Sequence, residues 1–388
     1  MPILNRAAEL HDEITAWRRE LHSKPELLFA VEQTAEFVRA KLEAFGCGEI
    51  VTGLGQTGVV GIIRGKRGDG PCIGLRADMD ALPLEEETNK PYRSTVPGMM
   101  HACGHDGHTA MLLGAARYLA ETRNFAGTVA LIFQPAEEGG GGGREMVKDG
   151  LMERFDITSV FGMHNMPGVP VGHFALRPGP IMAATAEFTI TVRGKGGHAA
   201  MPHTTVDPVV TAAKLIDSLQ SIAARSADPV KSVVVSVTKI QGGDSHNIIP
   251  DKVTLLGTVR TLETEMNALA EERMRAICRG VGEAHGATID LIYQSNYPVT
   301  YNHAEETAFA ADVARQVADP ANVAADVAPV MGGEDFSYML EARPGAFIFL
   351  GNGDSANLHN PAYDFNDEII PHGVSYWVRL TETALAPQ

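Results

Sequence analysis

The sequence predicts an α/β protein with a larger domain, built on a mostly parallel, mixed sheet flanked by helices, and a smaller inserted α+β domain. Two observations lead to this fold class. Short apolar, strand-like segments alternate with helical segments over the first and last parts of the chain, which is typical of layered α/β folds. In the middle of the chain the order becomes strand-helix-strand-strand-helix-strand, which is the order of a ferredoxin-like domain.

The first part of the chain supplies most elements of the larger domain. Helical patterns cover Ala7–Ser23, Glu32–Phe45 and Gly107–Ala120. Strand-like runs cover Gly58–Ile63, Cys72–Arg76, Thr128–Phe133 and Ser159–Met163. After Pro298 the pattern resumes, with a helix at Ala304–Val317, a strand at Ala346–Leu350 and a final helix from about His372.

The middle of the chain has its own set of elements and is expected to fold as an insertion. Its strands are predicted at Glu187–Val192, Ser232–Ile240, Val253–Val259 and Ala287–Ile292, and its helices at Val206–Ile222 and Glu263–Val281. The sequence therefore predicts a discontinuous larger domain formed by residues 1–183 and 295–388, which carries an inserted domain at 184–294.

Composition limits the classes of function. The chain has 388 residues with a formal net charge of −16, which disfavours binding to nucleic acids or anionic membranes. No apolar run approaches the roughly 20 residues that cross a bilayer. The N-terminal residues lack a signal-peptide pattern, and the four cysteines are widely spaced, so reduced thiols and a cytoplasmic location are expected.

Side chains that can bind metals lie near the ends of several predicted strands. Ligand sites in open α/β sheets lie beyond the carboxyl ends of the strands, so these side chains are expected to converge. A thiolate, three imidazoles and a carboxylate suit two divalent cations, and one carboxylate is left as a general base, which indicates a metal-dependent hydrolase. The candidates are Cys103, His105, Glu137, Glu138, His164 and His359, with Asp78 and Asp80 nearby.

The adjacent pair Glu137 and Glu138 is expected to divide two tasks. Neighbouring residues in extended backbone point in opposite directions, so one glutamate can bind metal while the other faces a water molecule as a general base. The helix that follows Cys103 is expected to favour its thiolate. The glycine run Gly139–Gly143 favours close approach of the backbone to a substrate or metal over a loose surface loop.

Six motifs together resemble one enzyme family. They occupy Leu75–Pro83, Met100–Thr109, Gln134–Glu138, Gly162–Asn165, Gly196–Ala199 and Met331–Phe336. In this order they resemble the bacterial and plant N-acyl-amino-acid amidohydrolases, which include hippurate hydrolases and auxin-conjugate hydrolases, within the wider aminoacylase and carboxypeptidase G family.

The resemblance implies a two-metal amide hydrolase with a catalytic domain and a lid domain that forms homodimers. It implies two metal ions held by Cys103, His105, Glu138, His164 and His359. Such a mixture of thiolate, imidazole and carboxylate ligands is compatible with Zn, Mn, Co or Ni. Glu137 would be the general base, and His198 in the lid would stabilise the oxyanion across a dimer. Asn247 and Arg260 would hold the carboxylate of a small N-acyl amino acid.

One departure from the wider family lies at Asp78-Met79-Asp80, where a histidine often stands first. Cys103 and His105 are expected to compensate for it, and Asp80 is expected to orient its neighbours. His108, at the start of a helix, is expected to cap that helix or to support a ligand, and His101 stays undecided.

Other functions fit less well. A dipeptidase or carboxypeptidase would use the same site and stays open. A metal-sensing protein without activity would lack a ligand or the base, and neither is missing. A redox protein built on Cys103 would need a second cysteine nearby in the sequence.

Overall fold

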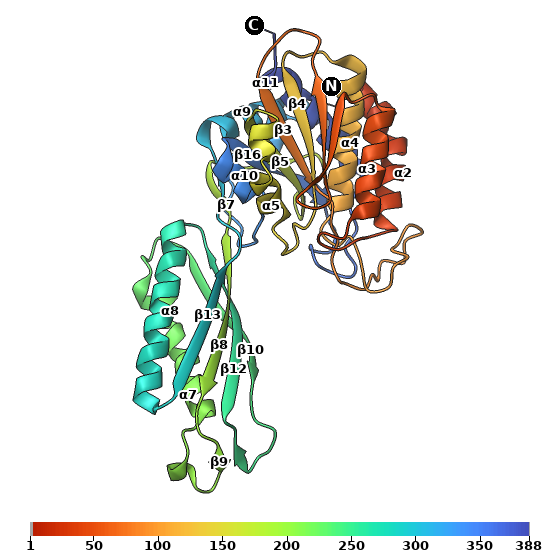
Figure 1. Cartoon of the computed structure of the whole chain (residues 1–388). Helices are drawn as coiled ribbons and strands as arrows, with labels where there is room; N and C mark the ends of the chain where they lie inside the picture. The colour runs from red at the N-terminus through yellow and green to blue at the C-terminus, as the bar shows by residue number, and fades with distance from the viewer. Residues whose placement is uncertain (1–2, 388) are drawn as a thin grey trace. The chain divides into compact units, whose positions relative to one another are not determined.

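The computed structural model describes residues 3–387, which form two compact units (Figure 1). Unit 1 comprises the described residues up to 181, residues 301–328 and those from 335 on, and unit 2 comprises 182–300 and 329–334. The chain leaves unit 1 along β7 (Gly179–Met182) and returns along β14 (Thr300–Asn302), and these two strands pair with each other. Residues 329–334, which were predicted to belong to the larger domain, cluster with unit 2.

Unit 1 is built on an eight-stranded mixed sheet. Its strands follow one another across the sheet in the order β1 (Glu49–Leu54), β2 (Gly58–Arg64), β4 (Thr128–Gln134), β3 (Cys72–Asp78), β5 (Ile157–Pro167), β16 (Gly345–Gly353), β6 (Phe174–Ala175) and β15 (Val323–Ala324). The four central strands β4, β3, β5 and β16 are parallel, with Leu75 of β3 opposite Leu131 and Phe161. β1 and β2 extend the sheet with antiparallel pairing. The predicted fold class is confirmed.

Helices flank this sheet, as the alternating pattern predicted. They are α1 (Asn5–Glu9), α2 (His11–His22), α3 (Glu32–Ala44), α4 (His105–Thr122), α5 (Gly142–Lys148), α6 (Leu151–Arg154), α9 (Ala304–Val317), α10 (Ser337–Ala342) and α11 (Ile370–Ala384). The predicted first helix is divided at Leu10 into α1 and α2. Among residues 3–387, no helix combines the length and the hydropathy that crossing a bilayer requires.

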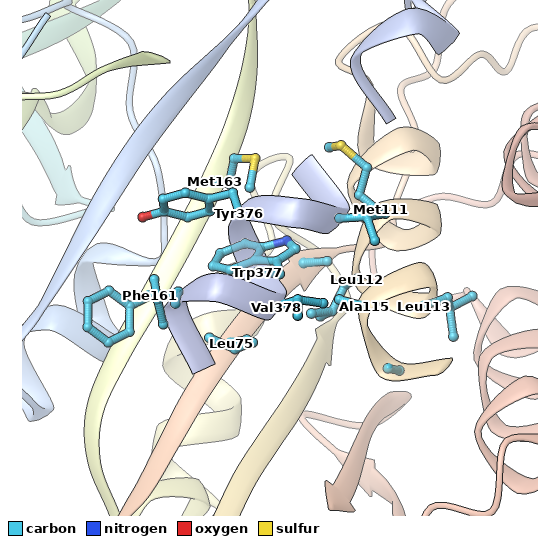
Figure 2. Packing of buried hydrophobic residues seen from close by; sticks show 14 of the residues in the cluster. Leu75, Met111, Leu112, Leu113, Ala115, Phe161, Met163, Tyr376, Trp377 and Val378 are labelled. Atoms are coloured by element: carbon cyan, nitrogen blue, oxygen red, sulfur yellow. The ribbon is translucent and has the colours of Figure 1, made fainter. Parts of the chain in front are cut away.

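The core of unit 1 lies between the sheet and helices α4 and α11. Figure 2 shows Trp377 of α11 between Met163 of β5 on one side and Leu112 of α4 on the other. The two helices approach closely because small residues lie at their contact: a Cβ atom on Gly373 would lie 2.2 Å from Sδ of Met111. This packing fixes α4, whose first residue is His105, relative to the central strands.

Unit 2 is a four-stranded antiparallel sheet with two helices. The strand order is β10 (Val233–Gln241), β12 (Lys252–Thr261), β8 (Ala184–Arg193) and β13 (Thr288–Ser295), and the helices are α7 (Pro208–Leu219) and α8 (Thr264–His285). With the chain order strand-helix-strand-strand-helix-strand, this is a ferredoxin-like arrangement. Alternate residues of β8 and β12 are buried against the helices, which is the pattern of a sheet with one covered face.

Candidate metal centre

The carboxyl ends of β3, β4 and β5 lie at one edge of the unit 1 sheet, because these strands are parallel neighbours. Asp78 is the last residue of β3, and the glutamate pair follows β4. His164 lies within β5 rather than after it, because this strand continues beyond the predicted Met163 to Pro167. The structure thus gathers the predicted candidates at the edge where α/β folds bind ligands.

Cys103 and His105 are held in place by the tight turn at Gly104. Gly104 has φ +93°, a conformation that side chains disfavour, and α4 begins at the next residue. A Cβ atom on Gly104 would lie 2.3 Å from Oδ1 of Asn165 and 2.7 Å from the hydroxyl of Tyr363. Only glycine therefore fits between the two candidate ligands.

One group of candidate ligands consists of Cys103, Glu138 and His359, whose donor atoms all lie within 4.8 Å of one another. The His359 Nε2 atom is 3.2 Å from Oε1 of Glu138. Cys103 Sγ lies 3.4 Å from the Nε2 atom of His164. Sulfur and nitrogen ligands of one tetrahedral zinc ion are about 3.5 Å apart, so this separation suits a shared cation.

A second group joins His105 to Glu137 and Glu138, again within 4.8 Å. The Nδ1 atom of His105 lies 2.8 Å from the carbonyl oxygen of Asp80, to which it donates when Nε2 is the free ligand atom. That Nε2 atom is buried without a hydrogen-bond partner in the described part of the chain, as expected for an atom whose partner is a cation. Glu138 belongs to both groups.

His164 is prepared to act as a neutral ligand. Its Nδ1 atom lies 2.6 Å from the carbonyl oxygen of Asn165, which leaves Nε2 toward Cys103. Burial holds the pKa of His164 well below its usual value. A neutral imidazole with an exposed lone pair is the form that binds metals.

The pKa of the Cys103 thiol differs from the sequence-based expectation. Burial, and then the charges of Glu138 and Glu137, raise the pKa of the Cys103 thiol well above its usual value, so the helix that follows does not by itself favour the thiolate. A bound cation would reverse this balance, since metal binding displaces the proton of a thiol ligand.

The glutamate pair also differs from the expected geometry. Glu137 and Glu138 lie in a turn after β4, not in extended backbone, and the residue before them, Ala136, has φ +54°. The two Asp80 oxygens accept hydrogen bonds from the backbone N–H groups of Glu137 (3.0 Å) and Glu138 (3.1 Å). The buried Asp80 therefore orients the whole turn, in the role expected for it.

Asp78 is held in a different way. It accepts a hydrogen bond from the fully buried Arg76 at 2.8 Å and lies 2.6 Å from Nδ1 of His108. The oxygen of Asp78 that accepts from Arg76 is also 3.6 Å from Nε2 of His105. Although burial opposes it, the charge that His105 carries in its protonated form and the charge of Arg76 lower the pKa of Asp78 well below its usual value.

The glycine run after the glutamates is packed rather than loose. Gly142 and Gly143 are buried at the start of α5, and the backbone N–H of Gly143 donates to Asp335 at 2.8 Å. A Cβ atom on Gly142 would lie 1.8 Å from the carbonyl oxygen of Pro135. Within unit 1, these glycines allow α5 to begin directly against the strand end that carries the glutamates.

In unit 2, His198 and Asn247 are neighbours. His198 lies on β9 (Gly197–His198), which pairs with β11 (Ile248–Ile249), and the N–H of Ala199 donates to the carbonyl oxygen of Asn247. Both side chains are exposed. Figure 1 shows β9 beyond the end of the sheet at which β12 begins.

Arg260 lies elsewhere in unit 2. It is near the last residue of β12, beside Thr185 and Val234 of the neighbouring strands, and burial lowers its pKa. It lies eight residues along the strand from Lys252, where β12 begins, which is a distance of about 26 Å. The structure does not bring Arg260 together with His198 or Asn247 within one unit.

Comparison with known proteins places the chain in a family. A model of peptidase family M20/M25/M40 matches residues 74–383. The chain belongs to this family. It is therefore a hydrolase, and the expected amidohydrolase resemblance is confirmed.

Three similar proteins extend this result. A hippurate hydrolase from Campylobacter jejuni is 43% identical over 98% of both chains. An N-acetylcysteine deacetylase from Bacillus subtilis is 38% identical over 97% of both chains. The crystal structure of a Bacillus subtilis dinuclear metal-binding peptidase of family M20 is 35% identical with a TM-score of 0.84, and it covers 98% of this chain and 100% of its own.

Sequence reasoning missed two of the residues that support the candidate ligands. Arg76 donates to Asp78, and Asn165 contacts His164 and His108, but neither was assigned a role there. His108, which was expected to cap its helix or to support a ligand, contacts Asp78. One signal was available for Arg76: it lies two residues from Asp78 on one strand, so the two share a face. No signal marked Asn165.

Proposed function

We propose that this protein is a two-metal amidohydrolase that cleaves N-acyl amino acids into a carboxylic acid and a free amino acid. The observation that carries this proposal is the pair of ligand groups that share Glu138. Cys103, His164, His359 and Glu138 would hold one cation, and His105 with Glu138 would contribute to the second. Mixed thiolate, imidazole and carboxylate ligands suit Zn, Mn, Co or Ni.

Bound divalent cations would polarise the scissile carbonyl and make a nearby water more acidic. Glu137, whose carboxylate lies in the His105 group, then takes a proton from that water. The water oxygen bonds to the carbonyl carbon, the carbon–nitrogen bond breaks, and Glu137 returns the proton to the leaving amine. Asp80 keeps Glu137 in position through its hydrogen bond to the backbone.

The substrate class follows from the relatives. Hippurate and N-acetylcysteine, which two of them are named for, are both N-acyl amino acids with a free carboxylate. We propose that Arg260 and Asn247 bind this carboxylate and that His198 stabilises the oxyanion. A guanidinium binds a carboxylate with two parallel hydrogen bonds, which suits Arg260.

We also propose a homodimer. Because about 26 Å of strand separate Arg260 from the end of unit 2 that carries His198, one substrate can contact both residues only if they belong to two copies of the chain. A lid domain that pairs two copies would supply this arrangement.

A panel of substrates tests the proposed class. We expect release of amino acid from hippurate and N-acetyl amino acids, and much slower cleavage of dipeptides with a free amine. Preference for free dipeptides would instead favour the dipeptidase or carboxypeptidase alternative. Metal analysis of the same preparation should give two equivalents of metal per chain.

Replacing Glu137 with Gln tests the general base. We expect kcat to fall by about 10²–10⁴-fold while metal content is retained, because the base is lost and the ligands remain. Glu138→Gln is the matched control, and it should lose metal. Near-wild-type turnover of Glu137→Gln would remove the assigned role.

A further inference from the structure

Asn165 follows the candidate ligand His164 and lies beneath the turn that carries the other two central ligands, Cys103 and His105. We propose that Asn165 and His108, anchored by Asp78, form a positioning platform that sets the geometry of these three ligands. This inference rests on the proposed metal-binding role of the three residues and assigns the platform residues no direct contact with substrate.

Asn165 contacts the ligand segments through both its backbone and its side chain. Its carbonyl oxygen lies 2.6 Å from Nδ1 of His164, the geometry that directs Nε2 of His164 to the cation. Its side-chain Nδ2 donates to the hydroxyl of Tyr363 at 2.6 Å. The Asn165 and Tyr363 side chains fill the space in which a Cβ atom of Gly104 would lie. One buried residue therefore orients one ligand and supports the turn between the other two.

His108 connects Asn165 to the strand β3. Its Nε2 atom lies 3.0 Å from the backbone N of Asn165 and 2.7 Å from Oδ1 of the same residue, so it accepts from the N–H when the nitrogen is unprotonated and donates to Oδ1 when it is protonated. Its Nδ1 atom lies 2.6 Å from Oδ1 of Asp78, to which it donates. His108 is buried one helical turn after His105, and their rings are 5.5 Å apart.

Asp78 anchors the platform because Arg76 holds it in place, in addition to its contact with His108. Arg76 donates to it at 2.8 Å and also to Gln134 (2.9 Å) and to Asp335 (3.0 Å). These four side chains are fully or almost fully buried. The chain Arg76–Asp78–His108–Asn165 thus ties the ends of β3, β4 and β5 to the start of α4.

The physical consequence concerns metal affinity. Ligands that are held in place before binding lose less conformational freedom when a cation binds, and removal of such supporting partners typically reduces metal affinity or activity by about 10–100-fold. A purely structural role would reduce stability without this selective loss.

Asn165→Ala tests the platform directly. The metal-free variant is titrated with Cd²⁺ and the absorption of the Cys103 thiolate–Cd²⁺ bond is recorded, and Zn²⁺ affinity is measured against a competing chelator. We expect at least about a tenfold loss of affinity for both ions. Unfolding of the metal-free protein is measured in parallel.

Asn302→Ala is the matched control. Asn302 is a fully buried asparagine of unit 1 that makes three hydrogen bonds of its own: its side chain donates to the carbonyl oxygens of Arg177 (3.0 Å) and Phe347 (2.9 Å), and accepts from the N–H of Phe347 (2.7 Å). It should destabilise the metal-free protein about as much as Asn165→Ala but keep wild-type metal affinity. Equal loss of affinity in both variants would overturn the proposal.

Two substitutions of His108 separate its contact with Asp78 from its contact with Asn165. In His108→Asn, the side-chain amide can replace the Nδ1 donor to Asp78 but not the contact with Asn165. In His108→Gln, the longer side chain can replace Nε2 near Asn165 but not the contact with Asp78. Because the platform needs both links, both variants should lose affinity, with kcat following metal occupancy. Affinity within twofold of wild type in both would overturn the proposal.

The outcome is separable from the proposed function. If the wild-type protein binds Cd²⁺ through Cys103 but cleaves no N-acyl amino acid, the substrate proposal fails, and the effect of the platform residues on metal affinity can still be measured. If the wild-type protein shows no thiolate–Cd²⁺ absorption, the platform proposal is overturned together with the ligand set.

Discussion

His22 is a fully buried histidine whose two ring nitrogens both face carboxylates. Its Nδ1 atom is 2.9 Å from Asp106 and its Nε2 atom 3.3 Å from Glu86, and Arg18 lies 3.5 Å from the same Asp106. Burial acts to lower its pKa, but the charge of Asp106, the hydrogen bond to it and the nearby carboxylate of Glu86 outweigh this effect and raise the pKa of His22 to about 9. The folded protein therefore holds a buried imidazolium at neutral pH.

This charge should make stability depend on pH on the alkaline side. Because the pKa rises from 6.5 to about 9 on folding, the contribution of this charge to the free energy of unfolding is complete below pH 6.5 and is lost as pH rises through 9. It amounts to about 3 kcal/mol. Urea unfolding of metal-free protein between pH 6 and 10 should show this loss in the wild type and not in His22→Gln. Parallel pH profiles would contradict the assigned charge.

Residue types at strand ends were enough to predict which side chains would gather, but not how each is held. Asp78 and Asp80 look equivalent in the sequence, yet one accepts from Arg76 and the other from the backbone of the glutamates. The difference depends on Gln134 and Asp335, which reach Arg76 from other segments. Local pattern carries no information about such contacts.

At the scale of elements, buried strands with continuous apolar runs were predicted well, because burial on both faces demands such runs. The short helix α5 was not predicted. It begins at two glycines, which are poor helix formers, and its first turn is stabilised by the Asp335 carboxylate, 192 residues away along the chain. Two-residue strands such as β6 and β15 are too short to show a periodic pattern of apolar residues, so the sequence does not predict them.

Gly142→Ala tests whether this helix start positions Glu137. The added Cβ would lie 1.8 Å from the carbonyl oxygen of Pro135, so the backbone before the glutamates must shift. We expect kcat/KM to fall by up to about 10²-fold, with a loss of thermal stability. Gly280→Ala in α8 is the control: its Cβ meets nothing within 4 Å, and it should stabilise the protein by about 0.5–1 kcal/mol without changing kinetics. Unchanged kinetics in Gly142→Ala would contradict this role.

At the scale of the whole molecule, the proposed catalytic roles are divided between the candidate metal centre of unit 1 and two distant ends of unit 2. The types and the order of the candidate metal ligands could be read from the sequence, because each lies in a short local motif. The separation of His198 from Arg260 could not, because it depends on the length and direction of β12 within a folded sheet.

Complementation between inactive variants tests the proposed sharing of sites. In a two-fold dimer whose sites each combine Arg260 of one chain with His198 of the other, His198→Ala and Arg260→Ala are each inactive alone. After unfolding and refolding an equal mixture, half of the dimers are mixed, and each mixed dimer has one intact site and one that lacks both residues. The mixture should therefore recover about a quarter of wild-type activity. Recovery should vanish when both substitutions are placed in every chain. If the mixture stays as inactive as its components while light scattering shows dimers, both residues act within one chain, and the proposed arrangement is wrong.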